Sequence, residues 1–167
     1  MPDDRNPVRK RHLVVTRLFN APVESVWKCW SDPNLIMRWW GPDLFTSPSC
    51  KVDFREGGTS VVCMRSPQGQ DFYSIWKYVK IVPLQHLEFT QNMSDESGHL
   101  LDPAKLGLPP EFPRDTRTVI VFKAKGGKTE MTMTEYNMPA PDTEMGKFAE
   151  LGLNQTLDKM VALFFES

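Results

Sequence analysis

Apolar and polar positions alternate along much of the chain, with the period of two that is typical of β-strands. The segment 12–19 is rich in Val, Leu and Thr and predicts a first strand. Further along, Gly57–Gly58 and Gly126–Gly127 separate pairs of such segments and predict hairpin turns. The strands expected after the first are 51–54, 59–65, 71–82, 84–91, 116–125 and 128–137.

The last predicted strand shows most clearly how the sheet should be covered. Met131 and Met133 share one face of it, whereas Thr132 and Thr134 share the other. Such alternation is typical of an antiparallel sheet that is buried on one side only. We therefore expect helices to cover the face that carries the methionines.

The spacing of apolar residues becomes helical in three places. Pro22 and Pro33 each open a short apolar stretch, and proline suits the first position of a helix because no backbone donor is lost there. The second short helix should end before Gly41–Pro42. From about residue 143 to 165, apolar residues recur every three or four positions and predict a long amphipathic helix. The fold class expected is α+β, with a curved antiparallel sheet of about six to seven strands.

Two stretches lack this regularity. Residues 1–11 are polar and predict a flexible N-terminal arm, which leaves 12–167 as a single domain. Residues 94–115 hold four prolines and predict one long loop with a short helical turn near 103–106. A loop of this length could shield the mouth of a binding site.

Composition narrows the functional classes. The chain has 167 residues and a net charge of −1, with 40% hydrophobic residues, which excludes a disordered chain and disfavours a general nucleic-acid binder. No apolar run approaches the roughly 20 residues that span a bilayer, and the N-terminus does not resemble a secretory signal. We expect a cytoplasmic protein that binds neither nucleic acid nor membrane. The three cysteines are widely spaced and form no C-x-x-C pair, so we expect reduced thiols and no metal site.

The sequence offers little that points to catalysis. No hydrolase, metalloprotease or phosphate-binding motif is present. No combination of the ionisable side chains forms a recognisable catalytic set, and we expect neither a cofactor nor a catalytic residue. The acid–base candidates are His86, His99, Asp43, Asp53, Glu88, Arg38, Tyr73 and Tyr78.

Several segments, taken in order, resemble a known family. Residues 17–22 (RLFNAP), 31–33 (SDP) and 38–42 (RWWGP) are similar to the opening of the activator of heat-shock-protein-90 ATPase homologue family. The resemblance continues through 53–58 (DFREGG), 87–90 (LEFT) and 126–129 (GGKT). That family belongs to the START-like (SRPBCC, helix-grip) superfamily, in which a curved sheet grips a long C-terminal helix. The chain departs from the family pattern at Trp76, where Gly is usual, and at Gly152–Leu153, where Gly-Trp is usual.

The resemblance implies a cavity between the sheet and the last helix that holds a small hydrophobic or aromatic molecule. Each candidate residue could equally be ordinary core, as large apolar side chains usually are. Two alternatives remain: a small-molecule enzyme of the cyclase or hydrolase type, or an interaction module resembling the chaperone ATPase activators. A homodimer is also plausible for such domains. The expected ligand-binding residues are Trp39, Trp40, Met64, Trp76, Phe89, Phe122, Met133, Phe148 and Leu153.

Overall fold

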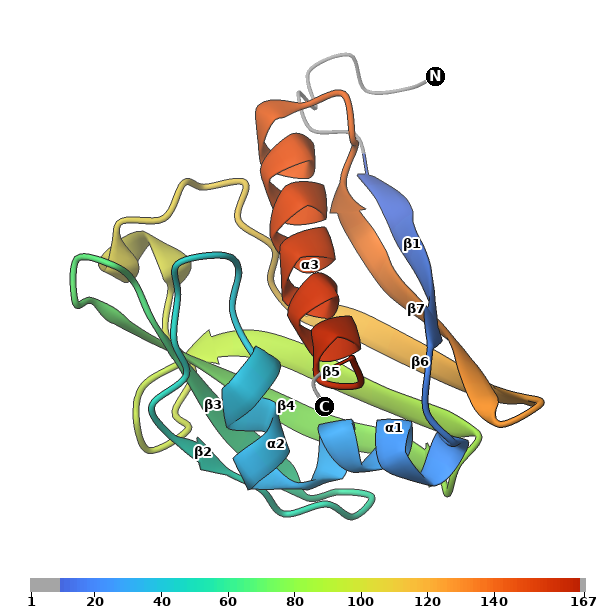
Figure 1. Cartoon of the computed structure of the whole chain (residues 1–167). Helices are drawn as coiled ribbons and strands as arrows, with labels where there is room; N and C mark the ends of the chain where they lie inside the picture. Colours follow the sequence, from blue (N-terminus) through green and yellow to red (C-terminus); the bar gives the residue numbers. More distant parts are fainter. Residues whose placement is uncertain (1–9, 166–167) are drawn as a thin grey trace.

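A seven-stranded antiparallel sheet curves around one long helix in the computed structural model, which describes residues 10–165 (Figure 1). The strand order is β1-β7-β6-β5-β4-β3-β2, so every neighbouring pair except β1 and β7 is consecutive in the chain. The predicted α+β helix-grip class is confirmed. The elements are β1 (Lys10–Phe19), α1 (Val23–Ser31), α2 (Pro33–Trp39), β2 (Cys50–Lys51), β3 (Thr59–Arg65), β4 (Asp71–Val82), β5 (His86–Ser94), the 3-10 helix η1 (Pro103–Leu106), β6 (Thr116–Lys125), β7 (Lys128–Pro139) and α3 (Glu144–Ala162).

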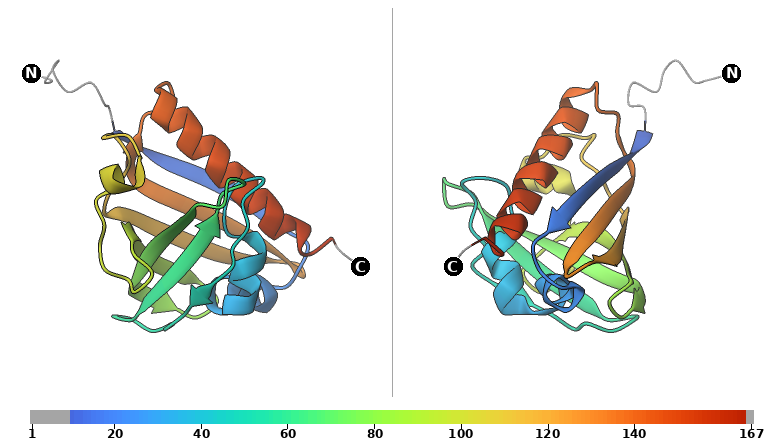
Figure 2. Two further views of the ribbon diagram at one scale, coloured as in Figure 1. Left: turned by 90° about the vertical axis from the view of Figure 1, so that its left-hand side faces the viewer. Right: turned by 45° about the vertical axis from the view of Figure 1, so that its right-hand side comes forward.

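Figure 2 shows how the layers are arranged: α3 crosses the hollow side of the sheet, and α1 and α2 close one end of that hollow. The C-terminal end of α3 lies beside these two short helices (Figure 1). None of the helices within residues 10–165 is long and apolar enough to cross a lipid bilayer.

The two short helices are fixed end to end by local hydrogen bonds. The Asp32 side chain accepts a hydrogen bond of 2.9 Å from the backbone N–H of Asn34 and so caps α2, which Pro33 opens as predicted. The indole N–H of Trp39 donates a 2.8 Å hydrogen bond to the carbonyl oxygen of Cys29 on α1. These bonds hold the pair of helices as one rigid end wall.

The long helix is tied down along its C-terminal half. Arg17 on β1 forms an ion pair of 2.8 Å with Asp158 and donates a 2.7 Å hydrogen bond to the side chain of Asn154. On the opposite side, Lys159 donates to the carbonyl oxygens of Pro42 and Phe45, at 3.2 and 3.3 Å. The helix is therefore held between the edge strand β1 and the loop that follows α2.

The first turn of α3 depends on a different kind of contact. Thr143 caps the helix by accepting a 3.0 Å hydrogen bond from the N–H of Gly146. A Cβ atom at Gly146 would overlap the carbonyl oxygen of Ala140, so only glycine allows the chain to turn this closely into the helix.

The core is an aromatic cluster beneath α1 and α2. Trp30 contacts Trp39 edge-on at 4.7 Å between ring centroids, and Trp76 stacks on Phe89 at 4.9 Å. All four side chains are almost completely buried. The dense packing here, with rings in edge and stacked arrangements, leaves little free space at this end of the hollow.

The observed boundaries of several elements differ from the predicted ones. The first strand begins at Lys10 and not at 12, because Lys10 and Arg11 pair with Pro139 and Met138; of the predicted arm 1–11, residues 1–9 lie outside the described residues. The fifth strand begins at His86, since Leu84 adopts a positive φ in the turn after Pro83. The predicted strand 51–54 shrinks to β2, and the long helix ends at Ala162.

Residues 95–115 connect β5 to β6 where a loop over 94–115 was expected, because Ser94 still belongs to β5. The helical turn η1 of this loop coincides with the expected segment 103–106 and is capped by Asp102, which accepts a 3.0 Å hydrogen bond from the N–H of Ala104. The segment is long enough to extend beside the N-terminal half of α3 (Figure 2).

Candidate ligand-binding cavity

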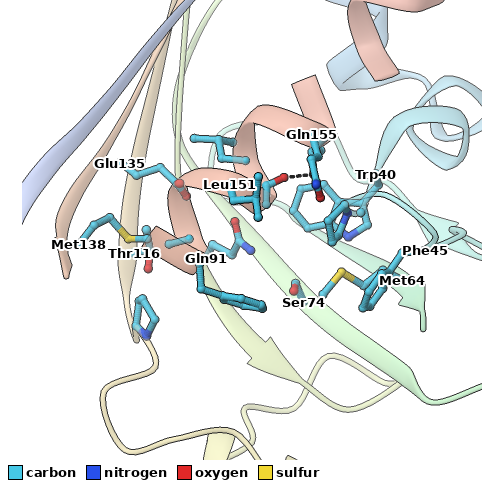
Figure 3. A pocket seen from close by; sticks show the side chains of 18 of the residues that line it. Trp40, Phe45, Met64, Ser74, Gln91, Thr116, Glu135, Met138, Leu151 and Gln155 are labelled. Carbon is cyan, nitrogen blue, oxygen red and sulfur yellow. Dashed lines mark hydrogen bonds between the residues drawn. The ribbon is translucent and has the colours of Figure 1, made fainter. Parts of the chain in front are cut away.

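A cavity of about 390 Å³ lies between the concave face of the sheet and the N-terminal half of α3 (Figure 3). Volumes of roughly 300 to 1,000 Å³ are usual for small-molecule sites. Its walls come from β3, β4, β5, β6 and β7, from α3, and from the loops around residues 41–45 and 112–113. The lining is mainly apolar, and aromatic and methionine side chains are prominent in it.

Most of the residues expected from the sequence come together in this wall. They lie on five different elements, and the exposed side chain of Phe148 places it at the mouth. The expected residues that line the cavity are Trp40, Met64, Phe89, Met133, Phe148 and Leu153.

Three expected residues do not line the cavity, and each is instead part of the core. Trp39 faces α1 and is held there by its bond to Cys29. Trp76 stacks on Phe89 and contacts Trp40 edge-on, so its ring is fully buried against residues of the wall. Phe122 packs against Trp27 at 5.1 Å under α1, at the filled end of the hollow. For Trp76 and Phe122, which face inward from strands, the position along the strand decides between core and cavity.

The mouth of the cavity is formed by exposed apolar side chains. Phe148 and Leu151 on α3 are both more than half exposed and also line the interior. Phe112 and Pro113 bring the long loop 94–115 to the same opening. The loop thus lies where a shield of the mouth was expected.

A polar patch interrupts the apolar wall at Gln91, Thr116 and Glu135 (Figure 3). Gln91 on β5 and Thr116 on β6 are direct cross-strand partners, and Glu135 on β7 pairs with Thr118, two residues further along β6. Diagonal neighbours of this kind lie about 7–8 Å apart, so the three side chains surround one region without bonding to each other. Among residues 11–165, none forms a hydrogen bond or ion pair with them.

Glu135 is the most unusual of the three. Its side chain is half-buried, and its carboxyl points into the cavity. Burial raises its pKa from 4.5 to about 7, because the ionised form loses its hydration and gains no compensating partner. The cavity therefore contains a carboxyl group that changes charge near neutral pH.

The acid–base groups suspected from the sequence lie mostly elsewhere. Glu88 points away from the cavity and binds Arg117 at 3.0 Å, which lowers the pKa of its carboxyl. The hydroxyl of Tyr78 is hydrogen-bonded to Ser60 at 2.8 Å, and burial raises its pKa to about 12. Asp43 is the one suspected group in the wall, and it is exposed at the mouth.

No metal-binding constellation occurs in the described part of the chain: no three His, Cys, Asp or Glu side chains are grouped to hold an ion. The three thiols are unpaired. Cys29 and Cys63 are buried, Cys50 is half-buried, and burial raises the pKa of each.

Glu135, Gln91 and Thr116 were not expected as site residues, although the sequence holds one signal for Glu135. Glu135 continues the series Met131, Met133 on the covered face of β7, so an acidic residue stood at a position predicted to face inward. An inward-facing acid on a half-buried strand breaks the expected pattern and marks a candidate functional position.

Comparisons with known proteins agree on the family and the fold. The family model described as Activator of Hsp90 ATPase homolog 1-like protein matches residues 20–164. The chain matches none of the curated proteins with which it was compared.

Among solved structures, a protein of Arthrobacter aurescens superposes with a TM-score of 0.75 at 24% identity, covering 96% of this chain and 91% of that one. A protein of Nitrosomonas europaea gives 0.72 at 19% identity, covering 91% and 92%. The AHSA1 protein of Silicibacter pomeroyi gives 0.70 at 20% identity, covering 92% and 96%. At these identities the structural similarity establishes the fold alone.

Proposed function

The chain belongs to the Activator of Hsp90 ATPase homolog 1-like family, and we propose that it is a binding protein that encloses a small, mainly apolar molecule between its sheet and α3. The observation that carries this proposal is the cavity of about 390 Å³. Protein interiors are close-packed and rarely keep voids much larger than a water molecule. A space of this size, open at one side, is typical of a site for a ligand.

The chemistry of the wall supports the same proposal. Aromatic rings such as Trp40 and Phe89 offer flat apolar surface, and Met64 and Met133 contribute flexible side chains that adapt to different shapes. The side chains come from a rigid sheet on one side and from a single helix on the other. Such a wall favours binding by apolar contact with little reorganisation of the protein.

Gly152 provides a direct test, because it lines the cavity at the middle of α3. The nearest atom to a Cβ built at this position is the Cβ of Pro42 at 4.0 Å, so a side chain fits there without overlap. In Gly152→Leu the added atoms would occupy cavity space. The matched control is Lys147→Leu, an exposed position of the same helix outside the wall.

The assay is the fluorescence of N-phenyl-1-naphthylamine, a neutral apolar probe that brightens when it leaves water. We expect saturable binding to the wild-type protein and to Lys147→Leu, and at least tenfold weaker binding to Gly152→Leu. Unchanged affinity in Gly152→Leu would place the probe outside this cavity. Absence of binding to the wild-type protein, for this probe and for every naphthyl probe used below, would refute the proposed function.

One observation favours a second candidate, a small-molecule enzyme of the cyclase or hydrolase type. Glu135 is a buried acid that faces the cavity with a pKa near the working pH, as proton transfer requires. The remaining acid in the wall, Asp43, lies at the mouth. A molecule that leaves the wild-type protein chemically changed, but leaves Glu135→Gln unchanged, would establish this activity.

Location and assembly stay predictions. The unpaired thiols Cys29, Cys50 and Cys63 fit a reducing compartment such as the cytoplasm. Native mass spectrometry of the purified protein would count the copies in each particle and reveal a retained ligand in the same measurement.

A further inference from the structure

The charges around the cavity have one sign only. Of the described residues that line it, Asp43 and Glu135 are the acidic ones, and none is Lys, Arg or His. Asp43 interacts electrostatically with Lys159 outside the wall, whereas Glu135 has no charged neighbour that affects its pKa. The interior of the cavity is therefore a place where a positive charge would find a partner and a negative one would not.

The polar patch can accept several hydrogen bonds from a single ligand group. Around Glu135 stand the amide of Gln91 and the hydroxyl of Thr116, both unpaired among residues 11–165 and both directed to the same region (Figure 3). Carboxylate, amide and hydroxyl oxygens all accept hydrogen bonds, and an ammonium group has three N–H donors to offer. The three acceptors come from three neighbouring strands, so the sheet itself fixes their spacing.

The rest of the cavity wall suits a ligand that carries a positively charged nitrogen. Trp40, Phe89 and Phe148 present aromatic rings to the cavity, and the negative face of an aromatic ring attracts a cation. The apolar surface of these rings also accepts a hydrocarbon body. Hence one end of the cavity fits a charged nitrogen and the remainder fits an apolar skeleton.

We propose that the molecule selected by this cavity is an apolar amine, whose ammonium group binds the carboxylate of Glu135 with Gln91 and Thr116 as further acceptors. The inference rests on the proposed binding function and names the chemical class of its ligand. An apolar carboxylate of the same size is excluded, since its charge would lie beside Glu135 without a cation to balance it.

The protonation behaviour of Glu135 fits this role. Because its pKa lies at about 7, roughly half of the molecules already hold a carboxylate at neutral pH, so little free energy is needed to ionise it for an incoming ammonium group. Its cross-strand partners, Thr118 on β6 and Leu13 on β1, do not titrate.

The neighbouring strand β1 carries two cations, Arg11 opposite Met138 and Arg17 opposite Met131, and neither is a cause of the raised pKa of Glu135. The residues that α3 contributes to the wall are uncharged, and Asp43 stands exposed at the mouth as the single other titratable group. The pH dependence of amine binding should therefore report Glu135 alone.

Three probes that share a naphthalene ring test the inference: 2-(1-naphthyl)ethylamine, 2-(1-naphthyl)ethanol and 1-naphthylacetate. Calorimetry at pH 8 should show the amine binding the wild-type protein about 10- to 100-fold more tightly than the alcohol, and the carboxylate more weakly than either. In Glu135→Gln the advantage of the amine should fall below threefold, with the alcohol bound as before. The retained binding of the alcohol shows that the variant is folded.

The matched control is Glu130→Gln, which removes one carboxylate from the outward face of the same strand. In this variant the three probes should keep the order of affinity that they show with the wild-type protein. Between pH 8 and pH 6 the affinity of the wild-type protein for the amine should fall about tenfold as Glu135 takes up its proton, and the affinity for the alcohol should stay constant.

The outcomes separate the two proposals. If the neutral probes bind and the amine shows no advantage, or keeps its advantage in Glu135→Gln, the inference is overturned and the binding function stands. If neither N-phenyl-1-naphthylamine nor any of the three naphthyl probes binds, both fail together.

Discussion

Replacing Glu135 by Gln should stabilise the protein, and by an amount that depends on pH. The carboxyl has a pKa of about 7 in the folded protein and an ordinary value of 4.5 in the unfolded chain. Between these two values the folded state holds the proton while the unfolded state has lost it, so stability falls as the pH rises through this window. Below pH 4 both states are protonated and the effect vanishes.

The magnitude follows from the difference between the two pKa values. One pH unit of difference corresponds to about 1.4 kcal/mol, so a carboxyl raised from 4.5 to about 7 weakens the folded state by about 3 kcal/mol above pH 7. Glutamine has nearly the same shape and cannot ionise. The free energy of unfolding of Glu135→Gln, relative to the wild-type protein, should therefore rise by about 3 kcal/mol between pH 4 and pH 8.

Urea denaturation at half-unit steps of pH, followed by far-UV circular dichroism, measures this difference directly. Glu130→Gln is the control, because it removes the same charge from the same strand on the outer face. Its profile should run parallel to that of the wild-type protein. If Glu135→Gln also runs parallel to the wild-type protein, the carboxyl is hydrated or paired in solution, and both its raised pKa and its isolation in the cavity wall are wrong.

Two further predictions concern other parts of the molecule. Gly152→Ala should raise the free energy of unfolding by up to about 1 kcal/mol, since alanine favours the helix and its Cβ has open space. Gly146→Ala should lower the free energy of unfolding by about 1–3 kcal/mol, because its Cβ overlaps the carbonyl of Ala140. Equal effects of the two variants in urea titrations would contradict this prediction. The thiols of Cys29 and Cys50, with pKa values raised to about 12 by burial, should react slowly with Ellman's reagent at pH 8 and rapidly in urea. Fast labelling of the folded protein would show instead that these thiols are accessible.

Local chemistry made the fold predictable from the sequence. Pro33, the glycine pair at 126–127 and the alternation in β7 each act through contacts with near neighbours, and the structure shows them as expected, whereas Pro22 is the N-cap of α1 and not its first residue. The differences arise where distant segments decide. Lys10 belongs to a strand because Pro139 lies opposite.

The cavity was only partly predictable for the same reason. Strand parity identifies which side chains face α3, and Phe89 and Met133 follow from it. Parity cannot tell whether an inward position meets the end wall of α1 and α2, as Trp76 and Phe122 do, or the open half beneath the start of α3. That distinction depends on where the helices cross the sheet, which no local pattern in the chain records.

The position of free space follows from how the two walls are filled. On the sheet side Trp76 stacks on Phe89. The helices α1 and α2, which are hydrogen-bonded to each other, close this end of the hollow. On the helix side Gly152 offers no side chain, and α3 is tied to β1 and to the loop after α2 only in its C-terminal half among the described residues. Space therefore remains beneath the N-terminal half.

Glu135 shows that this space is not simply a packing defect. Met131 and Met133 occupy the preceding inward positions of β7 and are buried, so an apolar side chain at 135 would continue the pattern and remove a cost of about 3 kcal/mol at neutral pH. Such a cost is a large fraction of the 5–15 kcal/mol by which a typical domain is stable. A carboxyl group held at this position, without a partner in the wall, is better explained by what it binds than by any contribution to folding.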